Sequence, residues 1–284
     1  MKADLHIHSR VSDGSLEIRD IVSLAKTLGF EALAIVDHDT VAGLAAAENA
    51  GQALGVRIIS GIEISAYDYK RDRKAHILGY LLDEPQQLGE VCRPMLTQRQ
   101  TTSKWIIETL SEAGYPISWD FVNKLARGST NIYKQHIMHA LMELGYTSAL
   151  KGELYRKLFA KPQAGDPGGI AYKDIDYLDV FEAVKAIKRA GGVSVLAHPS
   201  GYNNMELIPE LLASGLDGLE AWHPSHDEAA VQLIISEAKK YGLILTGGSD
   251  FHGMYEGKPN SLGSCHTAEE WLELLYERKN TLHL

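Results

Sequence analysis

The chain has 284 residues, 45% of them hydrophobic and 23% charged, which is the composition of an ordinary globular protein with a large core. Its net charge of −9 argues against a broad electrostatic grip on nucleic acid. No apolar run reaches the roughly 18 residues that a membrane span needs. Cys92 and Cys265 lack the spacing of a disulfide or thiolate-metal framework, and no signal-peptide pattern precedes Asp4. We therefore expect a cytoplasmic protein with no membrane association and no obligate protein partner.

The first third of the chain alternates between predicted strands and helices. A strand over residues 3–7 is followed by helical spacing of apolar residues up to Gly29, a strand over 32–36 and an Ala-rich helix that ends near Gly55. Residues 56–65 predict a third strand with a break at Gly61, and residues 76–82 predict a fourth.

The middle of the chain predicts only helices, and the alternation then returns. Helices are expected over residues 99–114, 119–126, 132–145 and 148–160, and a Pro- and Gly-rich loop follows them. The last part predicts strands over 193–197, 216–221 and 243–246, separated by helices over 179–190, 205–214, 227–241 and 267–277.

This order predicts an α/β fold. Strands joined through single helices pair in parallel, and about seven such strands suggest a closed or nearly closed βα barrel of the TIM type. Residues 1–84 and 174–284 would form the barrel. Residues 85–173 are too long for a loop and would form a helical insertion subdomain over the active-site mouth.

Imidazole and carboxylate side chains follow most of the predicted strands. In a βα barrel the carboxyl ends of the strands converge on one mouth, where active sites are built. His76 is the exception, because it opens its predicted strand. The side chains in these positions are His6, His8, Asp13, His38, Glu63, His76, His198, His223, Asp250 and His252.

A lone histidine at a strand end is usually a solvated residue, but so many polar groups at one mouth would be costly without a cation. Imidazole and carboxylate ligands without thiolate suit Mn²⁺, Fe²⁺ or Zn²⁺. The candidate ligands are the nine side chains other than His223, and nine ligands fit two or three divalent ions rather than one. Three ions against Asp13, Glu63 and Asp250 would leave a charge of about +3, which would attract a phosphate group despite the acidic chain.

The motifs DLHIHSRVSDG, VDHDT, GIEIS, AHILGY, LAHP and GSDFH resemble, in order and spacing, those of the PHP (polymerase and histidinol phosphatase) family. The resemblance covers residues 3–83 and 174–284, and EAWHPSH is similar to the stand-alone phosphoesterase branch. It implies a distorted seven-stranded barrel and a trinuclear site. One ion would take His6, His8, Glu63 and Asp250, and Glu63 would bridge to a second ion on His76 and His198. Asp13, His38 and His252 would hold the third.

The resemblance also implies a reaction: in-line attack on phosphorus by a metal-activated hydroxide. The first expectation is hydrolysis of the 3′-phosphate of nucleoside 3′,5′-bisphosphates. A 5′–3′ exoribonuclease acting on short RNA, or a phosphatase of another small phosphorylated metabolite, stays open because the same centre can serve each of them.

Five residues are candidates for contact with substrate or for catalysis. Lys134 occupies the place where many relatives carry a phosphate-binding Arg, and it supplies a point charge instead of a bidentate fork. His223 is expected to contact phosphate or protonate the leaving group, and Asp39 to orient a metal-bound histidine. Tyr133 and His136 would line the pocket from the insertion.

Two further hypotheses come from other classes. An amidohydrolase also opens with a His-X-His pair, but Glu63 stands where such an enzyme would carry a bridging lysine. A non-catalytic metal-binding module attached to a polymerase is disfavoured by the complete ligand set and by the absence of polymerase sequence.

Overall fold

The computed structural model describes residues 2–255 and 260–282. Its strands fall into two sheets with the orders β10-β1-β2-β3 and β6-β4-β5-β7-β8-β9. The strands are β1 (Lys2–Ile7), β2 (Ala32–Ile35), β3 (Arg57–Ile58), β4 (Gly61–Asp68), β5 (Arg73–Tyr80), β6 (Leu178–Asp179), β7 (Val193–Leu196), β8 (Gly218–Trp222), β9 (Ile244–Gly247) and β10 (Thr267–Ala268).

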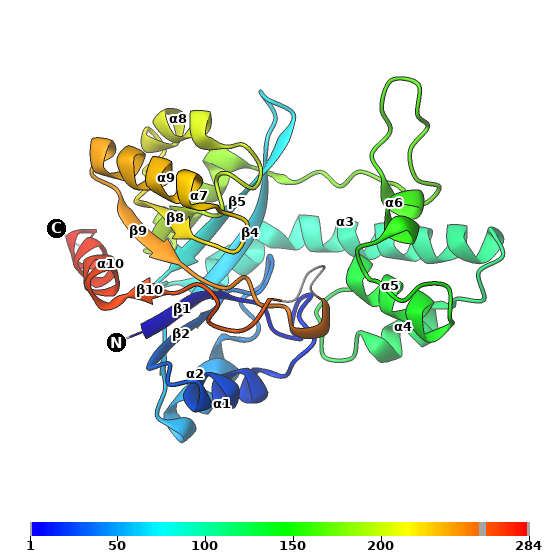
Figure 1. Cartoon of the computed structure of the whole chain (residues 1–284), viewed down its shortest axis with the longest axis horizontal. Coiled ribbons are helices and arrows are strands. Elements are labelled where there is room, and N and C mark those ends of the chain that lie inside the picture. The colour runs from blue at the N-terminus through cyan, green and yellow to red at the C-terminus, as the bar shows by residue number, and fades with distance from the viewer. Residues whose placement is uncertain (1, 256–259, 283–284) are drawn as a thin grey trace.

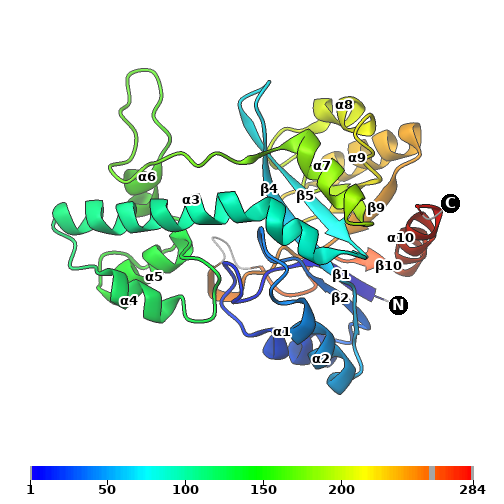
Figure 2. The ribbon, with the colours of Figure 1, turned by 180° about the vertical axis from the view of Figure 1, so that it is seen from behind.

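Helices surround the two sheets and form a separate group on one side (Figures 1 and 2). Among the described residues no helix has both the length and the apolar character needed to cross a bilayer. The helices are α1 (Ile18–Thr27), α2 (Leu44–Leu54), α3 (Pro85–Glu112), α4 (Trp119–Leu125), α5 (Lys134–Glu143), α6 (Glu153–Phe159), α7 (Val180–Arg189), α8 (Ile208–Leu212), α9 (Glu228–Tyr241) and α10 (Glu269–Thr281).

The α/β class is confirmed, but the seven-stranded TIM-type barrel is not. Within the described part of the chain the hydrogen-bonded strands make two sheets and no closed ring. Isolated bridges join the sheets where the polar residues gather, Ile7 pairing with Phe251 and His38 with Glu63. The ring stays open because each bridge is a single pair and does not extend into a ladder.

The fourth predicted strand begins earlier than expected and runs in the opposite direction. It is β5, which pairs antiparallel with β4 and with β7, so the expectation of purely parallel pairing was wrong. His76 therefore lies in mid-strand opposite Ser65. In an antiparallel strand the first half reaches the edge where its parallel neighbours end, and this explains how His76 reaches the same end of the sheet.

Helices α3 to α6 pack around a hydrophobic cluster of their own. Ile106 and Leu110 of α3 meet Ile137 and Leu141 of α5 there, all of them buried. The first half of α3 instead packs on the larger sheet, where Leu88 contributes to the main core. Helix α3 thus extends from the sheets to the helical group, as Figure 2 shows.

Candidate metal centre

All nine residues expected to bind metal lie together at one end of the two sheets. Seven of them come from the carboxyl end of a strand or from the segment that follows it, whereas Glu63 and His76 lie inside the paired strands β4 and β5. The nine residues are His6 on β1, His8 and Asp13 after it, His38 after β2, Glu63 on β4, His76 on β5, His198 after β7, and Asp250 and His252 after β9.

The first group is formed by His6, His8, Glu63 and Asp250. Glu63 Oε2 lies 3.2 Å from His6 Nε2 and 3.1 Å from His8 Nε2. Asp250 Oδ1 lies 3.3 Å from each of the same two nitrogens. Two imidazole nitrogens and two carboxylate oxygens thus face a common point.

Glu63 also belongs to a second group through its other oxygen. Glu63 Oε1 lies 2.8 Å from His76 Nδ1 and 3.2 Å from His198 Nε2. His38 Nδ1 approaches Glu63 Oε2 at 3.3 Å. The Glu63 carboxylate therefore faces two neighbouring groups of possible metal ligands, one through each of its oxygens.

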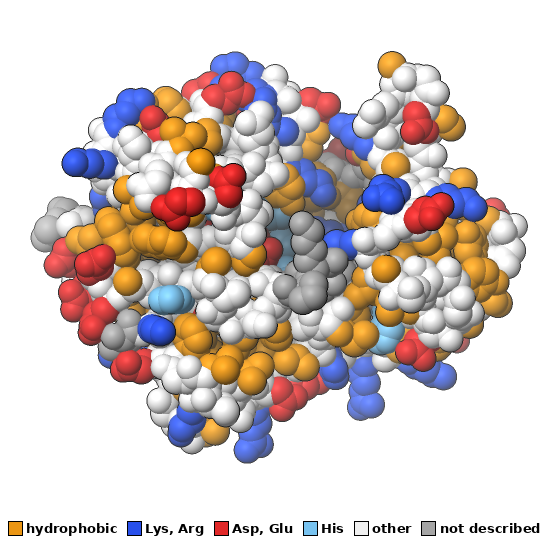
Figure 3. Space-filling model, in the orientation of Figure 1, with side chains coloured by type: hydrophobic (Ala, Val, Ile, Leu, Met, Phe, Trp, Pro, Cys, Tyr) orange, Lys and Arg blue, Asp and Glu red, His pale blue; other side chains and the backbone are white. Residues whose placement is uncertain are grey.

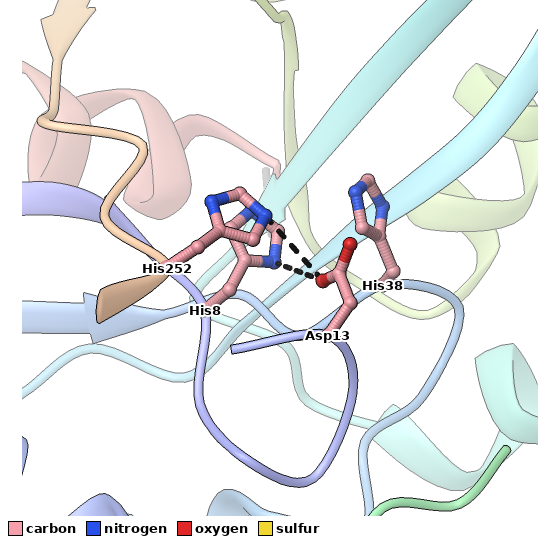
Figure 4. A group of neighbouring side chains, drawn as sticks. All are labelled: His8, Asp13, His38 and His252. Atoms are coloured by element: carbon pink, nitrogen blue, oxygen red, sulfur yellow. Dashed lines mark ion pairs between the residues drawn. The ribbon is translucent and has the colours of Figure 1, made fainter. Parts of the chain in front are cut away.

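The third group combines His8, Asp13, His38 and His252. In Figure 4 the Asp13 carboxylate faces the rings of His8 and His252, with His38 on its other side. Asp13 Oδ1 lies 3.4 Å from His252 Nε2 and 3.8 Å from His8 Nδ1.

These groups have the chemistry of a cation site. The Nε2 atoms of His6 and His8 are buried and make no hydrogen bond to the described residues, which is costly unless a cation takes their lone pairs. Burial lowers the pKa of His38 to about 3, so its ring keeps a free lone pair at neutral pH. Burial alone would raise the pKa of Glu63, but the facing imidazoles of His38 and His6 hold it well below its usual range. The residues present therefore fit divalent ions.

Buried carboxylates that the sequence analysis did not assign hold the loops of the site in place. Asp4 accepts the backbone N–H groups of Ser249 and Gly263, each at 2.9 Å, and so fixes the segment that carries Asp250. Asp37 accepts the N–H of Ser9 at 2.8 Å and the hydroxyl of Ser12 at 2.7 Å, which fixes the loop between His8 and Asp13. A single acidic residue inside an apolar strand, as in Ala3-Asp4-Leu5, is the signal that could have identified Asp4.

The backbone at the site is constrained as well. Asp39, His198 and Asp250 have positive φ angles of 60°, 27° and 51°. Residues other than glycine adopt this region at a cost and tend to do so at functional sites. Gly248 passes so close to β1 that an added Cβ would lie 2.3 Å from the backbone nitrogen of His6. Only glycine fits there.

A pocket extends from this cluster to a group of positively charged side chains, called the cationic wall below: Lys74, Arg99, Lys134, Lys151 and Lys173. Figure 3 shows the molecule hollowed between the sheets and the helical group, with Lys and Arg side chains beside the hollow. At one end the pocket is lined by seven residues of the cluster, among them Asp13, Glu63 and Asp250. Its other lining residues include Lys74, Arg99, Lys134, Lys151 and Lys173, together with Tyr133, Tyr155, Tyr177 and Tyr202.

The start of α5 places some, but not all, of the predicted substrate-binding residues at this pocket. Lys134 and Tyr133 line it, and the Tyr133 hydroxyl donates to the carbonyl of His38 at 3.2 Å. Gln135, which the sequence analysis did not select, lines it too and donates to Asp13 Oδ2 at 2.7 Å. His136 is absent from the described lining. Its Nδ1 accepts the N–H of Tyr133 at 3.0 Å and so caps α5.

The two predicted catalytic residues, His223 and Asp39, are absent from the described lining of the pocket. His223 Nδ1 accepts the N–H of Ser225 at 3.0 Å, and its Nε2 lies 3.3 Å from Asp250 Oδ2. Asp39 accepts the N–H of Ser65 at 2.7 Å and pairs with Arg99 at 2.9 Å, and among the described residues no hydrogen bond or ion pair joins it to an imidazole. Their predicted roles stay predictions.

The sequence matches known proteins along most of its length. Residues 4–192 match the family model described as PHP domain. A phosphoribosyl 1,2-cyclic phosphate 1,2-diphosphodiesterase of Eggerthella lenta is 42% identical, over 92% of this chain and 97% of that protein.

Two other relatives and one solved structure have different descriptions. A 5′–3′ exoribonuclease of Haemophilus influenzae is 31% identical over 88% of this chain and 90% of its own. A 3′,5′-nucleoside bisphosphate phosphatase of Chromobacterium violaceum is 28% identical over 89% and 88%. A structure from Bifidobacterium adolescentis, described as a candidate metal-dependent phosphoesterase, superposes with a TM-score of 0.86 at 31% identity and covers 97% of this chain and 96% of that one.

Proposed function

Because the chain belongs to the PHP domain family and is a hydrolase acting on phosphoester bonds, we propose that its substrate is a small ribose compound carrying two phosphate groups. One observation carries the proposal: a single pocket joins a cluster of metal-binding residue types to a wall of lysine and arginine. One end suits the phosphoester that is cleaved, and the other suits a second phosphate.

At the cluster end the nine residues would hold two or three divalent ions of Mn²⁺, Fe²⁺ or Zn²⁺. His6, His8 and Asp250 would share one ion with Glu63, which would connect it to an ion on His76 and His198. The remaining group around Asp13 and His38 would hold the third. When bound, such ions neutralise phosphate oxygens and lower the pKa of an attacking water.

The cationic wall would recognise a second phosphate. Lys134 and Lys74 approach the pocket from α5 and β5, and Lys151 and Lys173 come from the segments on either side of α6. Ammonium groups act as point charges without the fixed fork of arginine, so they tolerate phosphates at slightly different positions. A substrate with one phosphate would leave this wall without a partner.

The first candidate substrate is phosphoribosyl 1,2-cyclic phosphate, the compound named for the relative at 42% identity. The second is a nucleoside 3′,5′-bisphosphate, our expectation from the sequence motifs and the compound class named for a relative at 28%. Short RNA, the substrate class of the exoribonuclease relative, would use the same cations for its backbone.

The insertion would act as a cover over this pocket. We assign residues 85–173 to a subdomain whose α5 region contributes Tyr133, Lys134 and Gln135 to the lining. Because Tyr133 and Gln135 also contact His38 and Asp13, the cover and the metal-binding loops would form one unit. In this arrangement His223 would position Asp250 through the contact between His223 Nε2 and Asp250 Oδ2. Asp39, which follows β2, would fix β4 through the hydrogen bond that it accepts from Ser65.

The test is a substrate panel with Mn²⁺ added. We would compare kcat/KM for phosphoribosyl 1,2-cyclic phosphate, adenosine 3′,5′-bisphosphate, AMP and 5′-phosphorylated short RNA, and follow the phosphorus signals by NMR. We expect kcat/KM to be higher for the two compounds with two phosphates than for AMP, and highest for the cyclic compound. Asp250→Ala is the inactive control.

Other outcomes separate the alternatives. A higher kcat/KM for the bisphosphate selects the second candidate, and preference for RNA selects the exoribonuclease. If kcat/KM for AMP equals kcat/KM for the two-phosphate compounds, the cationic wall has no role in substrate recognition. Hydrolysis of an amide, without cleavage of any phosphoester, would favour the amidohydrolase hypothesis.

A further inference from the structure

Glu220 is a buried carboxylate that the proposed reaction leaves without a role. It lies on β8 between apolar residues, with no solvent exposure. Its two oxygens contact two different parts of the metal centre. Glu220 Oε1 lies 2.9 Å from His6 Nδ1, and Glu220 Oε2 accepts the backbone N–H of His198 at 2.9 Å.

The first contact fixes the tautomer of His6. An ionised carboxylate accepts hydrogen bonds and donates none, so the proton of a neutral His6 ring must sit on Nδ1. The lone pair is then on Nε2, the nitrogen that faces Glu63 and Asp250. This is the tautomer that can bind a cation in the first group.

The second contact fixes the backbone at His198. This residue has a φ of 27°, a conformation that needs support from its surroundings. The hydrogen bond from its N–H to Glu220 supplies such support and directs the ring toward Glu63, 3.2 Å from His198 Nε2. One carboxylate thereby couples the end of β1 to the end of β7.

His223 directly follows β8, the strand that carries Glu220, and its ring proton is on the other nitrogen from that of His6. Its Nδ1 accepts both the N–H and the hydroxyl of Ser225, at 3.0 and 2.7 Å, so the ring proton sits on Nε2. His6, Glu220 and His223 lie close enough together to hold a cation. With its proton on Nδ1, however, His6 directs its lone pair toward Glu63 and Asp250, and His223 Nε2 lies 3.3 Å from Asp250 Oδ2. Glu220 serves its neighbours instead.

We propose that Glu220 is a positioning residue of the metal centre, which sets the affinity of the ions bound by His6 and His198 without binding an ion itself. The inference rests on the proposed metal site. Loss of such a partner typically weakens metal binding about 10- to 100-fold.

The decisive variant is Glu220→Gln, which keeps the volume and removes one acceptor. An amide offers one oxygen and one NH₂ group, whereas His6 Nδ1–H and His198 N–H both need an acceptor. Either His198 loses its support or His6 turns its lone pair away from the first group. We expect Mn²⁺ affinity, measured by titration of the metal-free protein, to fall about 10- to 100-fold.

Asp217→Asn is the matched control. Asp217 is also buried, and its Oδ2 accepts the N–H of Ser194 on β7 at 2.9 Å, but at the end of the β7–β8 pair away from the cluster. It also pairs with Lys188 at 2.7 Å, so its loss should lower thermal stability while Mn²⁺ affinity stays at the wild-type value.

Three results would overturn the inference or locate the failure elsewhere. Wild-type affinity in Glu220→Gln, or an equal loss of affinity in both variants, contradicts a positioning role for Glu220. If the wild-type protein binds no divalent metal at all, the proposed function fails as well, and the two failures are distinguished by this measurement on the wild type.

Discussion

Lys134 shows how the charge of one residue can depend on its surroundings. Its ammonium nitrogen lies 5.1 Å from the ring centre of Phe159 and 5.8 Å from that of Tyr172. Burial, together with the cations Lys74 and Arg99, lowers its pKa to about 8. A lysine with a lowered pKa is charged below that value and loses its charge as the pH rises through it.

KM for a two-phosphate substrate should therefore rise as the pH passes 8, because the cationic wall loses one charge. Lys134→Arg, which stays charged, should remove this increase. KM of both proteins, measured on either side of pH 8, checks the prediction. An increase of equal size in the arginine variant would assign the effect to another group.

The sequence predicted which His, Asp and Glu side chains gather at one end of the sheets, but not which residues hold them in place. The nine predicted ligands form regular pairs and motifs at strand ends. Glu220 contacts His6 across 214 positions of the chain, and Arg99 contacts Asp39 across 60. Neither pairing leaves a local pattern, since each exists only after the sheets and α3 have packed.

At the scale of elements, Arg99 joins α3 to the segment that follows β2. Its guanidinium lies 2.9 Å from Asp39 Oδ2 and 4.8 Å above the ring centre of Tyr133. Asp39 is buried, and burial raises its pKa to about 6 although Arg99 opposes the shift. Burial costs both charges their hydration, and the ion pair between Arg99 and Asp39 offsets that cost.

Removing one partner should cost more than removing both. Arg99→Met should lower the free energy of unfolding by about 3–5 kcal/mol, because a buried charge is left alone. The double variant Arg99→Met/Asp39→Asn should recover part of the loss, since asparagine can still accept from Ser65. Urea unfolding measures both. Additive losses in the double variant would show that the pair does not interact.

The strand order shows a second limit of sequence patterns. Alternating strands and helices predicted parallel pairing, yet only residues 69–72 separate β4 from β5. So short a connection permits only an antiparallel pair. Starting the fourth strand at 76 hid this hairpin and made His76 look like an exception. Helices α3 to α6 were predicted better, because their apolar periodicity is local, although α3 begins at Pro85 and not at 99.

At the scale of the whole molecule, an acidic chain contains a pocket with a group of lysine and arginine side chains at one end. Eight acidic side chains are buried among the described residues, whereas Lys74, Lys134, Lys151 and Lys173 face the pocket. Divalent ions on the cluster would supply the second positive end. The two sheets meet at this cluster through isolated bridges, so the ions would also join the two halves of the fold.

The most direct test of the central claim is a metal titration of the stripped protein. Mn²⁺ bound per chain and phosphoester hydrolysis would be measured on the same samples. Activity should be absent without metal and should rise with occupancy to about two or three ions, because nine ligands exceed what one ion takes. His38→Ala should bind less metal and stay inactive. Full activity in the stripped wild-type protein would contradict the account.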